Sequence, residues 1–174
     1  MFPNLVNRTI TDDEIATLSH FYYGLDFGYD PDPTAFIECA LEGRTLYITA
    51  EEILRRASSE QIADAIRPHV SAQDLIICDS ADPRTIRDLR TQGLDARPVK
   101  KGKGSIEYGM KWLRSLDAII VDPKRTPAAA KEFGEYEHVR LKDGSYTSAY
   151  PDKDNHCVDG VRYSLEPVFR RGVE

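Results

Sequence analysis

Three aspartates stand at the ends of expected strands or on an expected helix, far apart in the chain. Asp26 closes a strand in the run GLDFG, Asp79 closes the apolar strand LIIC, and Asp159 lies in NHCVDGVRY on the last expected helix. An ionised carboxylate at the end of a buried strand is costly unless it is paired or binds a metal. Because ligands bind where strand ends of an α/β sheet converge, we expect these three side chains to meet at one edge.

Two further residues are candidates for the same site. His156 precedes Asp159 by three residues, which places both side chains on one face of a helix. Asp32 follows Asp26 by six residues, across a turn that contains Gly28, so its side chain can reach the same edge. We therefore take Asp32 as a candidate metal ligand, and we take Asp30 as a residue of the proline-rich surface turn DPDP.

The chemistry that suits such a cluster is hydrolysis of a phosphodiester bond. Carboxylate oxygens are hard ligands that favour Mg²⁺ or Mn²⁺. Two such ions, about 3.5–4 Å apart, activate a water and stabilise the leaving oxygen. Several carboxylates this close need cations to remain ionised. The alternative for any single aspartate is a structural role in capping a turn or helix, because aspartate is common there.

A basic loop lies between the second and third of these positions. The run RPVKKGKGS contains Lys100, Lys101 and Lys103 and no acidic residue, in a chain whose net charge is −6. Such a loop is typical of contacts to a nucleic-acid backbone, and Ser105 can cap the next helix and present its N–H groups to a phosphate. The alternative is a solvated loop. The glycines do not have the spacing of a P-loop, so no ATP-hydrolysing motif is visible.

The order of the expected strands and helices, which must position these residues, predicts an α/β fold. Aromatic and apolar runs indicate three antiparallel strands at the start, and the chain then alternates between helices and strands. This pattern predicts a mixed central sheet with helices on both faces. The expected strands are 21–27, 35–41, 45–49, 75–78, 96–99 and 118–121, and the expected helices are 58–70, 83–92, 105–115, 126–133 and 154–170. Residues 1–20 are expected to be a linker with a short helix that begins with a capping box, Thr11 with Glu14.

Length and composition agree with a single globular domain. The chain has 174 residues, of which 41% are hydrophobic and 30% charged. We see neither a membrane-spanning stretch nor a secretory signal. Three widely spaced cysteines form no CxxC motif, which argues against a disulfide framework or a cysteine zinc site and favours the cytoplasm. The acidic net charge argues against a passive nucleic-acid coat.

Four runs of the sequence resemble a known family. The runs GLDFGYDPDPTA, LIICDSADPRTIRDLRTQGLDA, KKGKGSIEYGMKWL and YPDKDNHCVDGVRYSL look like the C-terminal nuclease domain of tailed-phage terminase large subunits, over residues 22–171. The resemblance implies an RNase H-like nuclease domain over 21–174, which cuts concatemeric double-stranded DNA during genome packaging. It implies that Asp26, Asp79 and Asp159 hold the catalytic Mg²⁺ or Mn²⁺ ions, with His156 as a further ligand or proton-transfer group. Asp32 would be an additional acid near the second ion.

The resemblance also implies partners. In a full terminase these are an ATPase domain, a small subunit and a portal, all in the host-cell cytoplasm. Without a packaging ATPase the chain is expected to be a nuclease, not a motor. Two alternatives remain open at this stage. One is a non-catalytic DNA-docking or assembly remnant of a prophage, and the other is a haloacid-dehalogenase-like phosphatase that uses Asp30 and Asp32 in a DxDxT pattern.

Overall fold

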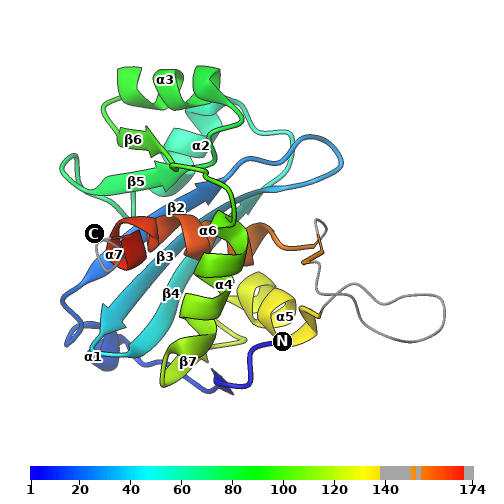
Figure 1. Ribbon diagram of the computed structural model, residues 1–174. Helices are drawn as coiled ribbons and strands as arrows, with labels where there is room; N and C mark the ends of the chain where they lie inside the picture. The colour runs from blue at the N-terminus through cyan, green and yellow to red at the C-terminus, as the bar shows by residue number, and fades with distance from the viewer. Residues whose placement is uncertain (138–149, 152–153, 171–174) are drawn as a thin grey trace.

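A mixed sheet of seven strands forms the centre of the described structure, with helices on both faces (Figure 1). The computed structural model describes residues 1–137, 150–151 and 154–170. The strands lie in the order β1-β7-β4-β3-β2-β5-β6. They are β1 Leu5–Asn7, β2 Phe21–Asp26, β3 Thr34–Glu42, β4 Thr45–Leu54, β5 Leu75–Cys78, β6 Asp95–Pro98 and β7 Ala118–Val121. The expected fold class, α/β with a mixed sheet, is confirmed.

The central strands form the antiparallel meander that the sequence predicts. β2 pairs with β3, and β3 pairs with β4, through a turn at Gly43 whose φ of 61° is in the left-handed region that favours glycine. β5 and β6 add in parallel on the side of β2, and β7 and β1 add in parallel on the side of β4. β4 continues to Leu54, five residues beyond the expected end at residue 49. The sheet is therefore antiparallel at its centre and parallel at its two sides.

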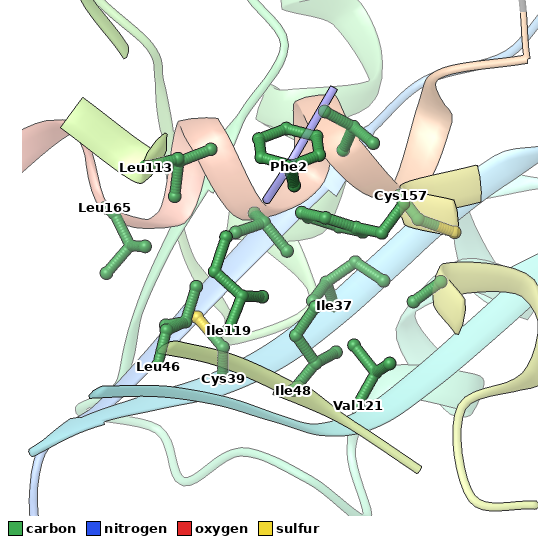
Figure 2. Packing of buried hydrophobic residues seen from close by; sticks show 14 of the residues in the cluster. Phe2, Ile37, Cys39, Leu46, Ile48, Leu113, Ile119, Val121, Cys157 and Leu165 are labelled. Atoms are coloured by element: carbon green, nitrogen blue, oxygen red, sulfur yellow. The ribbon is translucent and has the colours of Figure 1, made fainter. Parts of the chain in front are cut away.

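Helices cover the two faces of this sheet and bury two separate apolar clusters. On one face, α2 and α3 contribute Ile62, Ile66 and Leu89 to a cluster with residues of β2, β3 and β5. On the other face, α4, α5 and α6 pack on the sheet, and Figure 2 shows Leu113 and Cys157 above Ile37 and other strand residues. The helices are α1 Asp12–Ile15, α2 Ser59–Ile66, α3 Pro83–Thr91, α4 Ser105–Ser115, α5 Pro127–Glu135, α6 His156–Ser164 and α7 Glu166–Arg170.

Two expected helices are shorter than predicted, each next to a proline. The expected helix 154–170 is divided into α6 and α7 around Leu165, because Pro167 has no N–H to donate to the preceding turn. The expected helix 58–70 ends at Ile66, two residues before a proline, and Ser58 caps its first turn. No helix among the described residues is long and apolar enough to span a bilayer.

The first residues contribute more to the sheet than a linker does. Residues Leu5–Asn7 form the edge strand β1, parallel to β7, and Phe2 and Ile10 are buried. The short helix α1 begins after Thr11, whose hydroxyl accepts a hydrogen bond from the Glu14 N–H. The expected capping box is only half formed, because the Glu14 carboxylate pairs with Arg8 at 2.6 Å. A domain boundary at residue 20 remains a prediction.

Candidate functional site

Asp26 and Asp79 lie side by side because their strands are neighbours in register. β2 and β5 run parallel, and Leu25 pairs with Cys78, so each aspartate is the next residue on its strand. The Asp79 N–H donates to the Leu25 carbonyl at 2.8 Å, which continues the ladder by one step. Both carboxylates are almost buried, with 7% and 8% of the residue surface exposed. The strand ends therefore bring these two acids together, as the sequence predicts.

Asp159 reaches the same edge because α6 lies directly on β2. A Cβ atom on Gly24 would come within 1.9 Å of the Gly160 carbonyl oxygen, so only glycine permits this approach of helix and strand. A Cβ atom on Gly160 would come within 3.0 Å of Ile37 of the next strand. The close contact places the first turns of α6, with His156 and Asp159, beside the end of β2. These residues line one cavity of about 480 Å³ together with Asp26, Asp32, Asp79, Lys101 and Ser105.

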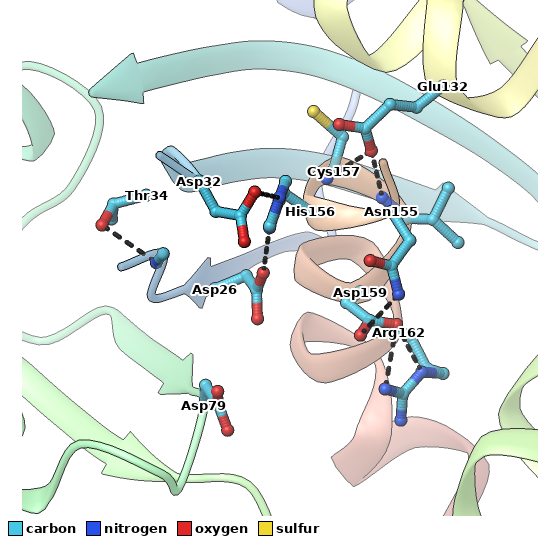
Figure 3. Close-up of polar contacts among 12 residues, drawn as sticks. Asp26, Asp32, Thr34, Asp79, Glu132, Asn155, His156, Cys157, Asp159 and Arg162 are labelled. Carbon is cyan, nitrogen blue, oxygen red and sulfur yellow. Dashed lines mark hydrogen bonds and ion pairs between the residues drawn. The ribbon is translucent and has the colours of Figure 1, made fainter. Parts of the chain in front are cut away.

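The imidazole of His156 connects two acids of this cavity. Its Nδ1 lies 2.9 Å from Oδ2 of Asp26, and its Nε2 lies 3.9 Å from Oδ1 of Asp32, as Figure 3 shows. The hydrogen bond to Asp26 raises the pKa of His156 above its ordinary value. Burial, together with the neighbouring charges of Asp159 and Asp79, raises the pKa of Asp26 to about 6, although the contact with His156 lowers it. Asp26 therefore carries negative charge in a place that disfavours it.

The other two buried acids also have cationic partners within the chain. Lys101 places its Nζ 2.5 Å from Oδ1 of Asp79, and the Arg162 guanidinium binds Oδ1 of Asp159 at 3.0 Å. Asn155 donates to the second oxygen of Asp159 at 3.2 Å. In Figure 3, Asp159 and Arg162 lie together along α6, and Asp79 lies apart from them at the end of β5. Each carboxylate is thus oriented toward a protein cation.

The donor set fits a hard divalent ion in its chemistry, although the side chains do not surround a single point. Within the described residues, no three histidine, cysteine or acidic groups lie close enough together to hold a metal ion as they stand. The cavity nevertheless collects carboxylate oxygens and one imidazole, which are ligands that Mg²⁺ or Mn²⁺ accepts. Burial first, and the neighbouring acids second, raise the pKa of Asp26, and a cation in the cavity would offset the cost of its negative charge. Asp79 and Asp159 would have to turn from Lys101 and Arg162 to join a common ion.

The basic loop separates this cavity from a second one. Lys101 and Ser105 line both the cavity with the acids and a neighbouring cavity of about 430 Å³ between the loop, α4 and α7, whereas Lys100 and Lys103 line the second cavity only. Ser105 begins α4, but this helix has no side-chain cap, because its N-cap residue is Gly104. The first turn of α4 therefore keeps N–H groups that an anion could bind. The four residues expected to contact DNA thus face two adjacent hollows.

Two residues that contact α6 or stabilise its side chains, Arg162 and Glu132, were not predicted from the sequence. Arg162 is 4% exposed and stacks over the Tyr163 ring at 4.8 Å in addition to its bond to Asp159. Its spacing of three residues from Asp159 on a helix was a usable signal. Glu132 lies on α5, and its carboxylate accepts hydrogen bonds from the N–H groups of Cys157 and Val158. No spacing in the sequence links Glu132 to α6, so only the fold reveals this contact.

The phosphatase alternative finds no support at this site. Asp30, which would be its nucleophile, is 55% exposed at the side chain and pairs with Arg56 at 2.8 Å. It does not line the cavity that contains Asp32. Asp30 and Asp32, the two acids of the DxDxT pattern, therefore do not line the same cavity.

Comparison with known proteins shows the family to which this chain belongs. A family model described as a terminase RNase H-like domain matches residues 26–167. The chain is 38% identical over 167 residues to the terminase large subunit of Bacillus phage SPP1, a match that covers 94% of this chain and 40% of that protein. It is 27% identical over 157 residues to the PBSX phage terminase large subunit of Bacillus subtilis (strain 168), covering 87% of this chain and 36% of that protein. The chain thus spans about two-fifths of the length of these curated relatives.

Solved structures of terminase nuclease domains have the same fold as this chain. The crystal structure of the large terminase (g2p) nuclease domain from bacteriophage SPP1 with bound Mn superposes with a TM-score of 0.88 at 38% identity, over 95% of this chain and 97% of that one. The P22 large terminase nuclease domain superposes with a TM-score of 0.67 at 17% identity, over 96% and 87% of the two chains. The family match covers both strand-end acids and the site helix. On these grounds the chain belongs to the family of terminase RNase H-like domains.

Proposed function

We propose that this chain is the nuclease domain of a phage or prophage terminase large subunit, and that it cuts concatemeric double-stranded DNA with Mg²⁺ or Mn²⁺. The observation that carries the proposal is that Asp26, Asp79 and Asp159, from two neighbouring strands and the helix packed on them, line one cavity. The solved SPP1 nuclease domain, 38% identical, contains bound Mn, which supports the choice of metal. This arrangement suits phosphodiester hydrolysis.

The metal ligands would be Asp26, Asp79, Asp159 and His156, with Asp32 at the margin of the cavity. Bound Mg²⁺ or Mn²⁺ supplies a nucleophilic water at neutral pH and offsets charge on the leaving oxygen, and two ions together supply both. His156 orients the carboxylate of Asp26 through its Nδ1, at 2.9 Å, and its Nε2 is the nitrogen left either to bind an ion or to transfer a proton. Asp32, with 63% of its side chain exposed, lies where it can contact either an ion or solvent.

The basic loop would hold the DNA backbone against this cavity. Lys101 and Ser105 line the acid cavity itself, and Lys100 and Lys103 line the hollow next to it, so neighbouring phosphates could be bound on both sides of the loop. Lysine side chains and helix N–H groups contact phosphates without reading bases. We therefore expect DNA binding by this loop to depend on salt concentration and to show little sequence preference.

The setting of this activity would be that of a packaging terminase. We propose that the partners are double-stranded DNA and, in the complete assembly, an ATPase domain, a small subunit and a portal. The site of action would be the host-cell cytoplasm, where the three free, buried cysteines would remain reduced.

One observation favours a second candidate, a non-catalytic DNA-docking or assembly module. Each buried acid of the cavity already has a protein cation or imidazole beside it, namely Lys101, Arg162 or His156. If these pairs were permanent, the cavity would have no need of a metal. Titration calorimetry separates the two functions, because the docking module predicts no binding of Mn²⁺ at millimolar concentration.

The test of the nuclease function is nicking of a supercoiled plasmid as Mn²⁺ or Mg²⁺ is raised. Asp79→Asn should reduce the nicking rate by at least about 100-fold, because a neutral amide is a poor ligand for a hard cation. The fold should persist, since the Asn oxygen can still accept the Ala81 N–H that Asp79 now accepts at 3.1 Å. Asp30→Asn, outside the cavity, is the matched control and should nick at the wild-type rate. Unchanged nicking by Asp79→Asn would refute the assignment.

A further inference from the structure

The helix that carries His156 and Asp159 is not capped by its own sequence. The N-cap residue of α6 is Asn155, whose side chain makes no capping hydrogen bond and instead donates to Asp159. The first N–H groups of a helix have no partner within the helix, and they must find one elsewhere when they are buried. At α6 that partner comes from another helix.

Glu132 of α5 supplies the missing cap. Its Oε2 accepts the N–H of Cys157 at 2.6 Å and the N–H of Val158 at 3.3 Å, and Figure 3 shows the carboxylate above the first turn of α6. A negative charge at this end of a helix is also favoured by the helix dipole. Burial raises the pKa of Glu132 and these two N–H donors lower it. The contact is therefore an interaction of an acid with the backbone between the two candidate ligands on α6.

The N-terminus of α5 is also capped by a carboxylate from another element, at a contact that does not touch α6. Its N-cap residue, Thr126, makes no side-chain capping bond. Glu51 of β4 accepts the N–H groups of Ala128 and Ala129 at 2.9 and 2.8 Å. Two successive carboxylate caps therefore connect the sheet to α5 and α5 to α6, but only the second touches the helix that carries candidate ligands.

We propose that Glu132 is a positioning residue of the metal site, which fixes the first turn of α6 so that His156 and Asp159 face the cavity. This inference rests on the proposed function. Glu132 binds neither a metal ion nor DNA in this role. It acts through the backbone of Cys157 and Val158, which lie between the two ligands in the sequence. Residues that orient metal ligands in this way typically change metal affinity about 10- to 100-fold when they are removed.

The experiment is a calorimetric titration of Mn²⁺ into the protein without DNA, beside a melting curve for each variant. Glu132→Ala should weaken Mn²⁺ binding about 10-fold. Glu132→Gln keeps an acceptor oxygen within reach of both N–H groups and should bind Mn²⁺ within about 3-fold of wild type. Glu51→Ala is the matched control, since it deletes an equivalent cap of α5. It should lower the melting temperature and leave Mn²⁺ affinity unchanged.

The outcomes distinguish this proposal from the function on which it rests. Wild-type Mn²⁺ affinity in Glu132→Ala, or equal weakening in Glu51→Ala, would overturn the positioning role. Failure of the wild-type protein to bind Mn²⁺ would instead overturn the proposed function. If Glu132→Ala does not fold, Glu132→Asp replaces it, because a side chain shorter by one methylene cannot reach both N–H groups. That variant should also bind Mn²⁺ more weakly, and wild-type affinity would contradict the proposal.

Discussion

Nδ1 of His156 lies 2.9 Å from Oδ2 of Asp26, although 130 positions of sequence separate the two residues. The contact joins the end of β2 to the first turn of α6, the two elements whose close approach Gly24 and Gly160 permit. It holds the carboxylate of Asp26 in an orientation toward the cavity and gives it one partner. That partner does not fully offset burial, since the pKa of Asp26 remains raised to about 6.

Replacing Asp26 should change how the stability of the metal-free protein depends on pH. The pKa of Asp26 is raised from 3.8 to about 6 in the folded state, first by burial. A raised pKa favours the folded state below about pH 4, and this contribution is lost as pH rises through about 6. Above that pH the ionised group costs on the order of 2–3 kcal/mol. Asp26→Asn should therefore be more stable than wild type at pH 7.5 in EDTA, by urea denaturation, and the difference should shrink toward zero near pH 4.

The control for this measurement is Asp30→Asn, which changes an exposed acid outside the cavity. It should follow the pH dependence of wild type, because exposed ion pairs contribute little to stability. A wild-type protein that is more stable than Asp26→Asn at pH 7.5 would contradict the picture of an unfavourably buried charge.

Divalent metal should raise the melting temperature, since an ion that binds only the folded state stabilises it. At a free Mn²⁺ concentration of about 100 times the dissociation constant the gain is about 2.7 kcal/mol. For a domain of this size that corresponds to roughly 5–10 °C in a calorimetric scan. Asp79→Asn should lose most of this shift and Asp30→Asn should keep it. Equal shifts in both variants would place the metal somewhere else on the protein.

Gly24→Ala should damage both stability and the site. The added Cβ would stand 1.9 Å from the Gly160 carbonyl oxygen, so α6 would have to move away from β2. Overpacking of this kind costs about 1–3 kcal/mol or more, and the shift would move Asp159 from the cavity. Urea denaturation and Mn²⁺ calorimetry test the two effects. Gly134→Ala is the control, because among the described residues no atom outside its own stretch of α5 lies within 4 Å of the new Cβ, and it should be neutral or stabilising by up to about 1 kcal/mol.

Lys101→Met should have opposite effects on metal and on DNA. Lys101 pairs with Asp79 at 2.5 Å, so removing its charge should free that carboxylate and tighten Mn²⁺ binding. The same change should weaken DNA binding and reduce the salt slope by about 0.9 if one phosphate contact is lost. Lys103→Met, at the neighbouring cavity, should weaken DNA binding alone. Mn²⁺ calorimetry and DNA binding at several salt concentrations measure both, and weaker Mn²⁺ binding in Lys101→Met would contradict the competition.

The sequence predicts the parts of the fold that rest on local pattern. The short strands at Leu75–Cys78 and Ala118–Val121 lie where continuous apolar runs in the sequence predict them. Two features were missed for physical reasons. Leu5–Asn7 is an edge strand of three residues, too short for a period-two pattern. The end of β4, AEEIL, places one glutamate on each face and so does not show the apolar alternation expected of a strand.

The candidate acids were foreseen because strand ends and helical spacing are readable from sequence. Asp26, Asp79 and Asp159 line the cavity that such reasoning predicts, and their role as metal ligands stays a prediction. Their partners were not foreseen. Lys101 was expected to contact DNA, and its pairing with Asp79 depends on how the loop folds back over β5. Glu132 reaches α6 only because α5 and α6 pack together, which no spacing indicates.

The most direct test of a shared metal site is a crystal of the protein soaked in Mn²⁺, with anomalous scattering used to locate the ions. We expect peaks within about 2.0–2.5 Å of carboxylate oxygens of Asp26, Asp79 and Asp159, with Asp79 turned from Lys101. Loss of those peaks in an Asp79→Asn crystal would show that Asp79 is needed for metal binding. Peaks confined to other acids, or three carboxylates still paired only with Lys101, Arg162 and His156 at saturating Mn²⁺, would contradict the account.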